Sequence, residues 1–172
     1  MPKEEEVVDL QIAGVEIYGF AFRHLPENIF VDQYQIQADL TFQVDASFEH
    51  LRVLLWVRVH PEDEALPAEK REEFSDYPLA KIDTGTIFTS EGLDRIIDEE
   101  KPLPPHPVLK EISQVAIDTT RGVLIEKLRG THLEGAIMPL IDIAALDLDS
   151  LAKEAAERLG AKSVETRDEQ SD

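Results

Sequence analysis

Apolar and polar side chains alternate without a break from Tyr34 to Val44. The even positions are apolar, and the odd positions carry Gln, Asp or Thr. Because successive side chains of a β-strand point to opposite faces, this pattern predicts a strand with one buried face and one face in water. No other stretch of the sequence constrains the local structure as strongly.

Three further strands are predicted in the N-terminal half, over about residues 7–24, 51–59 and 79–89. The first alternates less cleanly and contains Gly14 and Gly19, which predict a β-bulge or a close approach of two backbones. In the second, Leu54 and Trp56 make the opposite face partly apolar as well. Since the strands follow one another without intervening helices, we expect an antiparallel sheet.

A proline-rich segment from Pro102 to Pro107 cannot be helical as a whole and forms a stiff lead-in to the main helix. Pro107 suits the first turn of that helix. Apolar residues then recur at helical spacing from about Val108 to Arg129, and Gly130 is a natural stop.

A shorter helix is predicted from Ser150 to Leu159, with Asp149 as its N-cap and Gly160 as its stop. The predicted fold class is therefore α+β, with a four-stranded antiparallel sheet, one long helix and a short C-terminal helix. A chain of 172 residues fits one domain. We expect an acidic tail at 1–6, a single domain at 7–160 with an acidic loop at about 60–78, and a polar tail at 161–172.

The composition excludes several classes of partner. The chain has 36 acidic and 17 basic residues, for a formal net charge of −19. We expect no nucleic-acid partner and no binding to anionic membranes, because both depend on Lys and Arg. The sequence has no cysteine, no signal-peptide pattern and no apolar stretch long enough to span a membrane, so we expect a cytoplasmic protein.

One enzyme-like motif is present. Asp83-Thr84-Gly85 resembles the Asp-Thr-Gly loop of aspartic proteases, in which two aspartates share a proton and activate water. A single copy requires a homodimer for such chemistry. The alternative, which we favour, is an aspartate on a strand beside a glycine, with no catalytic residue in the chain.

The sequence predicts no metal site and no cofactor. Its histidines are scattered, without the i, i+4 pairing of a helical metal site, and no glycine-rich phosphate-binding loop occurs. Acidic residues between Asp94 and Glu100 are explained by a solvated helix end or loop. The histidines are His24, His50, His60, His106 and His132.

The order of the predicted elements and four short motifs resemble the SecB family of export chaperones, over about Val8 to Leu151. Each motif occurs at the matching point of the predicted fold. The motifs are GTIFTSEG from Gly85 to Gly92, the group Ile29, Phe30 and Tyr34, Arg129-Gly130-Thr131 followed by Pro139, and PLIDIAAL from Pro139 to Leu146.

The resemblance implies a non-enzymatic, ATP-independent holdase. In that family two protomers form an eight-stranded sheet, and two such dimers sandwich their long helices into a homotetramer. Unfolded polypeptides or preproteins bind in apolar grooves and are delivered to the motor ATPase of the Sec translocase. The groove residues implied here are Leu25, Ile29, Phe30, Tyr34, Trp56, Leu140, Ile143 and Leu146. For each of them taken singly, a place in the ordinary core is the open alternative.

The sequence departs from the family pattern where the motor ATPase docks. Acidic residues on the sheet face are replaced here by Gly19, Arg23 and Lys81. This exchange of charge places docking on the translocase in doubt. A scaffold dedicated to one partner, such as an antitoxin, therefore stays open as an alternative, and competition between unrelated unfolded clients would distinguish the two.

Overall fold

A computed structural model describes most of the strands and the long helix. The described residues are 9–25, 31, 33–45, 47, 49–62, 77–91, 93, 97, 103–136, 138–139, 141, 147, 150–151 and 153. Both predicted tails, and the acidic loop between residues 62 and 77, lie outside these ranges.

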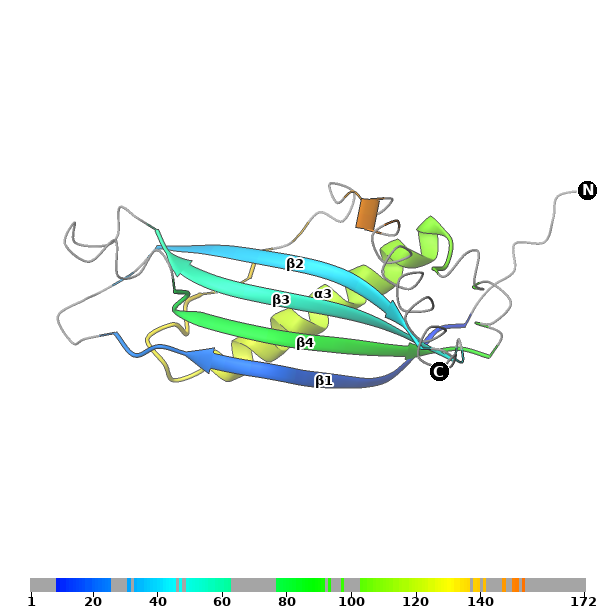
Figure 1. Ribbon diagram of the computed structural model, residues 1–172. Helices are drawn as coiled ribbons and strands as arrows, with labels where there is room; N and C mark the ends of the chain where they lie inside the picture. The colour runs from blue at the N-terminus through cyan, green and yellow to red at the C-terminus, as the bar shows by residue number, and fades with distance from the viewer. Residues whose placement is uncertain are drawn as a thin grey trace, which may run out of the picture.

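A four-stranded antiparallel sheet lies against a single long helix (Figure 1). The strand order is β1-β4-β3-β2, so β1 and β2 form the two edges. This arrangement confirms the predicted strands, their antiparallel pairing and the long helix. The elements are β1 at Gln11–Phe22, β2 at Tyr34–Val44, β3 at His50–Pro61, β4 at Ala80–Thr89 and α3 at His106–Leu128.

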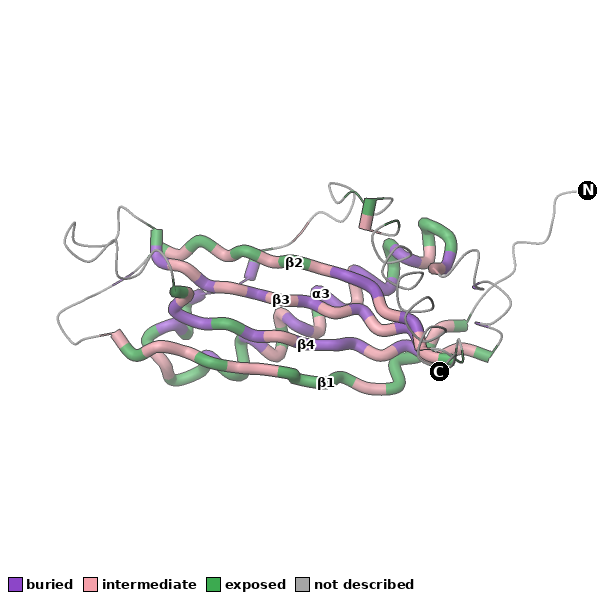
Figure 2. Tube along the Cα trace, viewed as in Figure 1, coloured by how far each residue is buried: buried purple, intermediate pink, exposed green. Residues whose placement is uncertain are grey.

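The two faces of the sheet have different surroundings. α3 lies against β3 and β4 on one face, which we call the helix face, and the opposite one is the outer face. Burial alternates along β3, with each odd-numbered residue from Leu51 to Val59 buried on the helix face and each residue between them half-buried (Figure 2). The core is thus a layer of strand side chains packed on Leu109, Ile112 and their neighbours in α3.

Two β-bulges interrupt β1, as Gly14 and Gly19 predicted. The pairing with β4 shifts between Ile12 and Gly14 and again between Ile17 and Gly19. Each bulge moves one residue out of the alternation, so the helix face is reached by Ile12 before the first bulge, by odd positions between the bulges and by even positions after the second. The bulges therefore let Ile17 and Phe20 both lie on the helix face.

The ends of α3 agree with the residues that predicted them. The helix begins at His106, two residues before the predicted start, and Pro107 lies in its first turn. Gly130 follows the helix with a φ of 74°, a conformation that costs glycine little because it has no Cβ. The second predicted helix is described only at Ser150, Leu151 and Lys153, which are helical, so its full extent stays a prediction.

Candidate functional site

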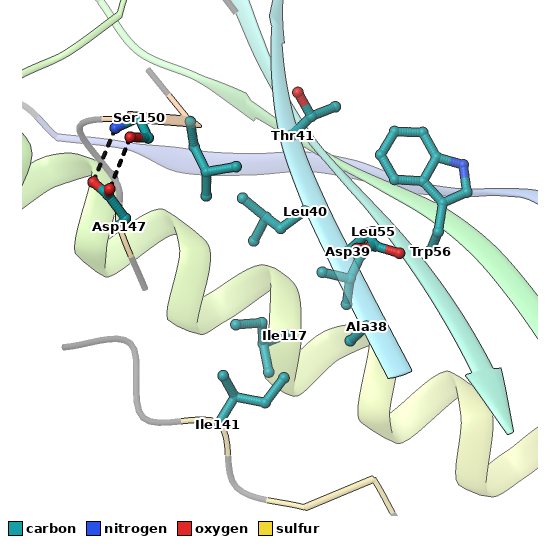
Figure 3. Close-up of a pocket in the computed structure, with 11 residues that line it drawn as sticks. Ala38, Asp39, Leu40, Thr41, Leu55, Trp56, Ile117, Ile141, Asp147 and Ser150 are labelled. Carbon is teal, nitrogen blue, oxygen red and sulfur yellow. Dashed lines mark hydrogen bonds between the residues drawn. The ribbon is translucent and has the colours of Figure 1, made fainter. Parts of the chain in front are cut away.

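An open cavity of about 700 Å³ lies between the edge strand β2, the middle of α3 and the segment that follows the helix (Figure 3). Strands, helix and C-terminal segment each contribute to its wall. The described lining residues are Ala38, Asp39, Leu40, Thr41, Leu55, Trp56, Ile117, Ile141, Asp147, Ser150 and Leu151. Most of these side chains are apolar, so the cavity presents a surface that water solvates poorly.

The regular alternation of β2 determines which side chains face the cavity from the sheet. Ala38 pairs with Val57 and Leu40 pairs with Leu55, which places all four on the helix face. Ala38 and Leu40 are only half-buried because α3 packs mainly on β3 and β4. Uncovered apolar side chains therefore remain along β2.

The C-terminal segment brings two more apolar side chains to the same place. Ile141 lines the cavity together with Leu40 and Ile117, and Figure 3 draws its side chain next to that of Ile117. Leu151 lines the cavity from the helical residues that begin at Ser150. Both residues are half-buried and pack on the edge of the core. Residues about a hundred positions apart in the sequence thus form one apolar surface.

The backbone of β2 borders the cavity. Four consecutive residues, Ala38 to Thr41, line it, although successive side chains of a strand point to opposite faces. The cavity therefore extends around the edge of β2 rather than lying under one face of the sheet. β2 pairs only with β3 in the described sheet, so this edge carries no further strand there.

Polar groups lie at the rim. Asp39 is exposed on the outer face opposite Trp56. Asp147 accepts hydrogen bonds from the backbone N–H of Ser150 at 3.0 Å and from its hydroxyl at 2.7 Å. These bonds are those of a helix N-cap, so Asp147 caps the turn that contains Ser150, while the predicted cap, Asp149, lies outside the described residues.

A second uncovered apolar surface follows the other edge of the sheet. Ile12, Val15 and Ile17 lie on the helix face of β1 and are 53%, 41% and 44% exposed. α3 packs on β3 and β4 and leaves this strip open. We call these three residues the β1 strip.

A cluster of aromatic and histidine side chains lies where β1 ends and β2 begins. The ring of Phe22 lies 4.7 Å from that of His24, and the His24 and His132 rings lie 6.4 Å apart. The hydroxyl of Tyr34, at the start of β2, donates a hydrogen bond of 3.2 Å to the carbonyl oxygen of His132. Burial, and secondarily the charge of His24, lowers the pKa of His132 below its usual 6.5.

The Asp-Thr-Gly motif is built into the sheet. A carboxylate oxygen of Asp83 lies 2.6 Å from a guanidinium nitrogen of Arg58. Thr84 is buried on the helix face, and its hydroxyl lies 2.7 Å from that of Thr120 in α3. Gly85 leaves room for the Tyr18 ring, which would lie 2.8 Å from a Cβ at this position. Each residue of the motif thus has a structural role.

The predicted groove residues fall into three groups. Trp56 lines the cavity wall, although its ring points away from Ile117 and Ile141 in Figure 3. Leu25 and Tyr34 are half-buried against the core, so their part in a groove stays a prediction. The remaining five, Ile29, Phe30, Leu140, Ile143 and Leu146, lie outside the described residues, and their role stays a prediction too.

Sequence reasoning missed most of the cavity. Ala38 and Leu40 belong to the strongest strand pattern, but the pattern does not reveal that the strand lies at an edge. Leu55 and Ile117 have the ordinary spacing of core residues in a strand and a helix. The PLIDIAAL motif from Pro139 to Leu146 contains Ile141, and this motif is the sequence signal for the C-terminal part of the wall.

Neither a metal site nor a membrane-spanning helix occurs in the part of the chain that the structure describes. No group of three or more His, Asp or Glu side chains there is arranged to hold a metal ion. Among the described helices, none is both long enough and apolar enough to cross a bilayer.

Comparison with known proteins gives one similar structure. No protein-family model matches the chain, and no curated protein sequence does. The chain is similar to the Mycobacterium tuberculosis SecB-like chaperone Rv1957, solved in complex with a ChAD peptide from the antitoxin Rv1956 HigA1. The similarity has 17% sequence identity and a TM-score of 0.38, and covers 78% of this chain and 86% of that chain. The family in the name of that structure is the one that the four motifs resemble.

Proposed function

We propose that the chain is an ATP-independent chaperone that holds segments of unfolded polypeptide in the cavity beside β2. The carrying observation is the apolar wall formed by Leu40, Leu55, Ile117 and Ile141 around an open space of about 700 Å³. Apolar side chains predominate among the described lining residues, and such side chains bind a molecule without reacting with it. We therefore propose a binding protein rather than an enzyme.

The energetics of such a wall favour many different clients. Burying apolar area contributes about 25 cal/mol per Å² whatever the shape of the side chain, so a fully buried leucine contributes about 1.5–3 kcal/mol. Several client side chains must be buried together to offset the loss of translational and rotational freedom on binding, about 4–15 kcal/mol. Binding of this kind selects for apolar content rather than for one sequence, which suits unfolded or pre-export polypeptides.

The β1 strip supports the proposal that the chain self-associates. Three apolar side chains are exposed on one face of an edge strand, where water solvates them poorly. Such a surface favours association with a partner that covers it. A second copy, paired along β1, would extend the sheet and cover this strip. We propose that a homodimer of this kind assembles further into a homotetramer.

The proposed setting is the cytoplasm, with unfolded polypeptides or preproteins as partners and no nucleic acid. Delivery to the motor ATPase of the Sec translocase is a weaker part of the proposal. Gly19 and Lys81 lie on the outer face, where the family carries acidic docking residues, and Gly19 lies opposite Asp83. A partner that recognises acidic residues on this face would meet a glycine and a lysine here instead.

An aspartic protease is the alternative from another functional class. The geometry of Asp83 speaks against it, because its carboxylate pairs with Arg58 and its neighbour Thr84 is bonded to the helix. A protease aspartate needs a partner carboxylate instead. Cleavage of a peptide at acidic pH that is lost in Asp83→Ala would restore this alternative.

Light scattering tests the proposed function directly. The purified protein is mixed with a chemically denatured client that aggregates on dilution, without nucleotide. We expect aggregation to fall as the protein is added and unrelated clients to compete with one another. Suppression for one client alone, without competition, would favour the dedicated scaffold, and no suppression at any ratio would refute the proposed function.

A further inference from the structure

The outer face of the sheet has an apolar centre. On β3, Leu54 and Trp56 lie half-buried on this face, between residues that are buried on the helix face. The ring of Trp56 points away from Ile117 and Ile141 in Figure 3. α3 covers the opposite face, and the described residues place no helix on this one (Figure 1). Water solvates such side chains poorly, so the centre of this face favours a partner that covers it.

Tyr18 completes the apolar centre from the edge strand β1. It lies at the second bulge of β1, between Ile17 and Gly19, and is 54% exposed. Its ring lies over Gly85 of β4, where a Cβ would be 2.8 Å from the ring and 3.1 Å from the Leu54 side chain. The ring of Tyr18 thus reaches across β4 toward β3. We call Tyr18, Leu54 and Trp56 the outer platform.

Basic side chains lie at both ends of the outer platform, on the two central strands. Arg58 and Lys81 are directly opposite each other at one end, and like charges in this arrangement oppose strand pairing. Arg52 lies at the other end of the platform, about 20 Å from Arg58 along β3. Neither Lys81 nor Arg52 forms an ion pair with a described residue, and the buried Nε of Arg52 has no hydrogen-bond partner there. An anionic group would therefore be stabilised at either end.

The acidic side chains of this face are placed elsewhere. Asp83 already pairs with Arg58, at 2.6 Å. Asp39 and Glu16 lie on the edge strands, and Glu16 accepts a hydrogen bond of 2.5 Å from the Tyr18 hydroxyl. The central strands therefore carry an excess of positive charge, in a chain whose net charge is −19. Since the chain as a whole repels anions, a partner is attracted only if it places its carboxylates over these cations.

We propose that the outer face binds an amphipathic helix of a partner protein, with apolar side chains in its middle and carboxylates near both ends. β3 and β4 are each paired on both sides, so their face offers no free backbone groups to an incoming chain. A helix satisfies its own backbone hydrogen bonds and can pack on such a face, as α3 does on the opposite one. A helix of about 14 residues spans the roughly 20 Å between the basic ends. The binding of such a partner goes beyond the proposed function and does not depend on it.

A second copy of the chain fits this face less well. Stacked on it about a twofold axis along or across the strands, a second copy would bring its basic ends onto the basic ends of the first. The residues that would meet are the unpaired cations Lys81 and Arg52. Like charges that meet in an interface oppose association, so a partner with carboxylates at these points is favoured.

A pair of helical peptides tests the proposed docking. Each has leucine along the middle of one face, and the residues near both ends are glutamate in one peptide and lysine in the other. Trp56 is the only tryptophan of the chain, so its fluorescence reports the binding of peptides that lack tryptophan. We expect the glutamate peptide to bind at least about tenfold more tightly than the lysine peptide. The net charge of −19 alone predicts the opposite order, so that order, or equal affinities, would overturn the proposed docking.

Reversal of one exposed cation tests where the peptide binds. Lys81→Glu should lower the affinity for the glutamate peptide and raise that for the lysine peptide, each by a few-fold, about what an exposed charge pair contributes. The matched control is Lys110→Glu, which makes the same exchange at an exposed position of α3, on the other side of the sheet. It should leave both affinities as in the natural chain. If the two variants behave alike, the effect is one of total charge, and docking beside Lys81 is wrong.

Leu40→Ala separates the docking site from the client cavity, which Trp56 also lines. The affinity for the glutamate peptide should be unchanged in this variant. If that affinity falls together with the affinity for clients, the peptide occupies the cavity, and the proposed docking is wrong while the proposed function stands. A change in the mass of the assembly in Lys81→Glu would show instead that a second copy covers the face, which also contradicts a partner helix. Peptide binding without any suppression of client aggregation would leave the docking site standing and refute the proposed function.

Discussion

The two edge strands of one sheet differ in almost every respect. β1 is bulged at two places and exposes the apolar side chains of the β1 strip beyond the reach of α3. β2 keeps an unbroken register from Tyr34 to Val44, exposes polar side chains and borders an apolar cavity on its helix face. Within the described sheet each of them pairs with one strand only, but the surroundings of each suit a different partner.

From this difference we propose that β1 serves self-association and that β2 serves client binding. The bulges let β1 place apolar residues of both parities on one face, which gives a continuous strip for another folded copy. β2 offers instead a backbone edge with an unbroken register, an exposed carboxylate and a cavity, which we propose fit an unfolded chain. We therefore expect substitutions in one edge to leave the function of the other unchanged.

The largest effect is expected at the β1 strip. Val15→Asp combined with Ile17→Asp should weaken self-association by at least about a hundredfold, because each copy loses the burial of two apolar side chains and gains charges to desolvate. Light scattering coupled to gel filtration measures the mass. Gln11→Asp, on the outer face of the same strand, is the control and should retain the assembly.

Binding of a client peptide in the cavity beside β2 should remain in each protomer of the double variant. If the assembly persists in Val15→Asp with Ile17→Asp, the copies associate elsewhere. If peptide binding disappears together with the assembly, the two edges are not independent.

A second prediction concerns how β4, the partner of β1, is held to the helix. Thr84→Val leaves the buried hydroxyl of Thr120 without its partner at 2.7 Å and should cost about 1–3 kcal/mol of stability in urea unfolding. The double variant Thr84→Val with Thr120→Val should recover most of this loss. Peptide affinity at β2 should not change, and a specific loss of affinity would show that the two regions are coupled.

The third prediction concerns the cavity beside β2. Leu40→Ala removes apolar surface from its wall and should lower peptide affinity by about tenfold while the mass of the assembly stays the same. Val123→Ala, at a half-buried position of α3 outside the described lining, is a matched control for the loss of apolar volume. Equal losses of affinity in the two variants would mean that the cavity is not where clients bind.

The smallest effect is expected from acidification. Because the pKa of His132 is lowered in the folded protein, the unfolded chain binds the proton first as the pH falls. The neutral imidazole therefore contributes its full stabilisation above pH 6.5, the usual pKa of histidine. This contribution is lost as the pH falls from 6.5 through the lower pKa of the folded state. Urea unfolding above and below this range should show a small loss that His132→Gln removes, and an unchanged loss in His132→Gln would assign it to another group.

Much of the fold was predictable because its signals are local. Alternation identified the strand at Tyr34–Val44, glycines marked the bulges of β1, and Pro107 and Gly130 marked the ends of α3. Each of these features depends on neighbours in the sequence. The order of strands in the sheet does not, and nothing in the alternation of β2 distinguishes an edge strand from a central one.

The site was less predictable for the same reason. The cavity brings together residues from β2, α3 and the segment after the helix, such as Leu40, Ile117 and Ile141. Each looks like a core residue in its own segment. What makes them a surface is that α3 packs on β3 and β4 and leaves the edge open, and this follows from tertiary packing alone.

Hydrogen exchange of the backbone amides, with and without a client peptide, compares the two edges in one experiment. We expect the amides of β2 between Ala38 and Thr41 to gain protection only when peptide is present. Those of β1 should be protected in the assembly whether peptide is present or not. Protection that appears along β1 on adding peptide, or binding that leaves the amides of β2 unchanged, would contradict the assignment of clients to the cavity beside β2.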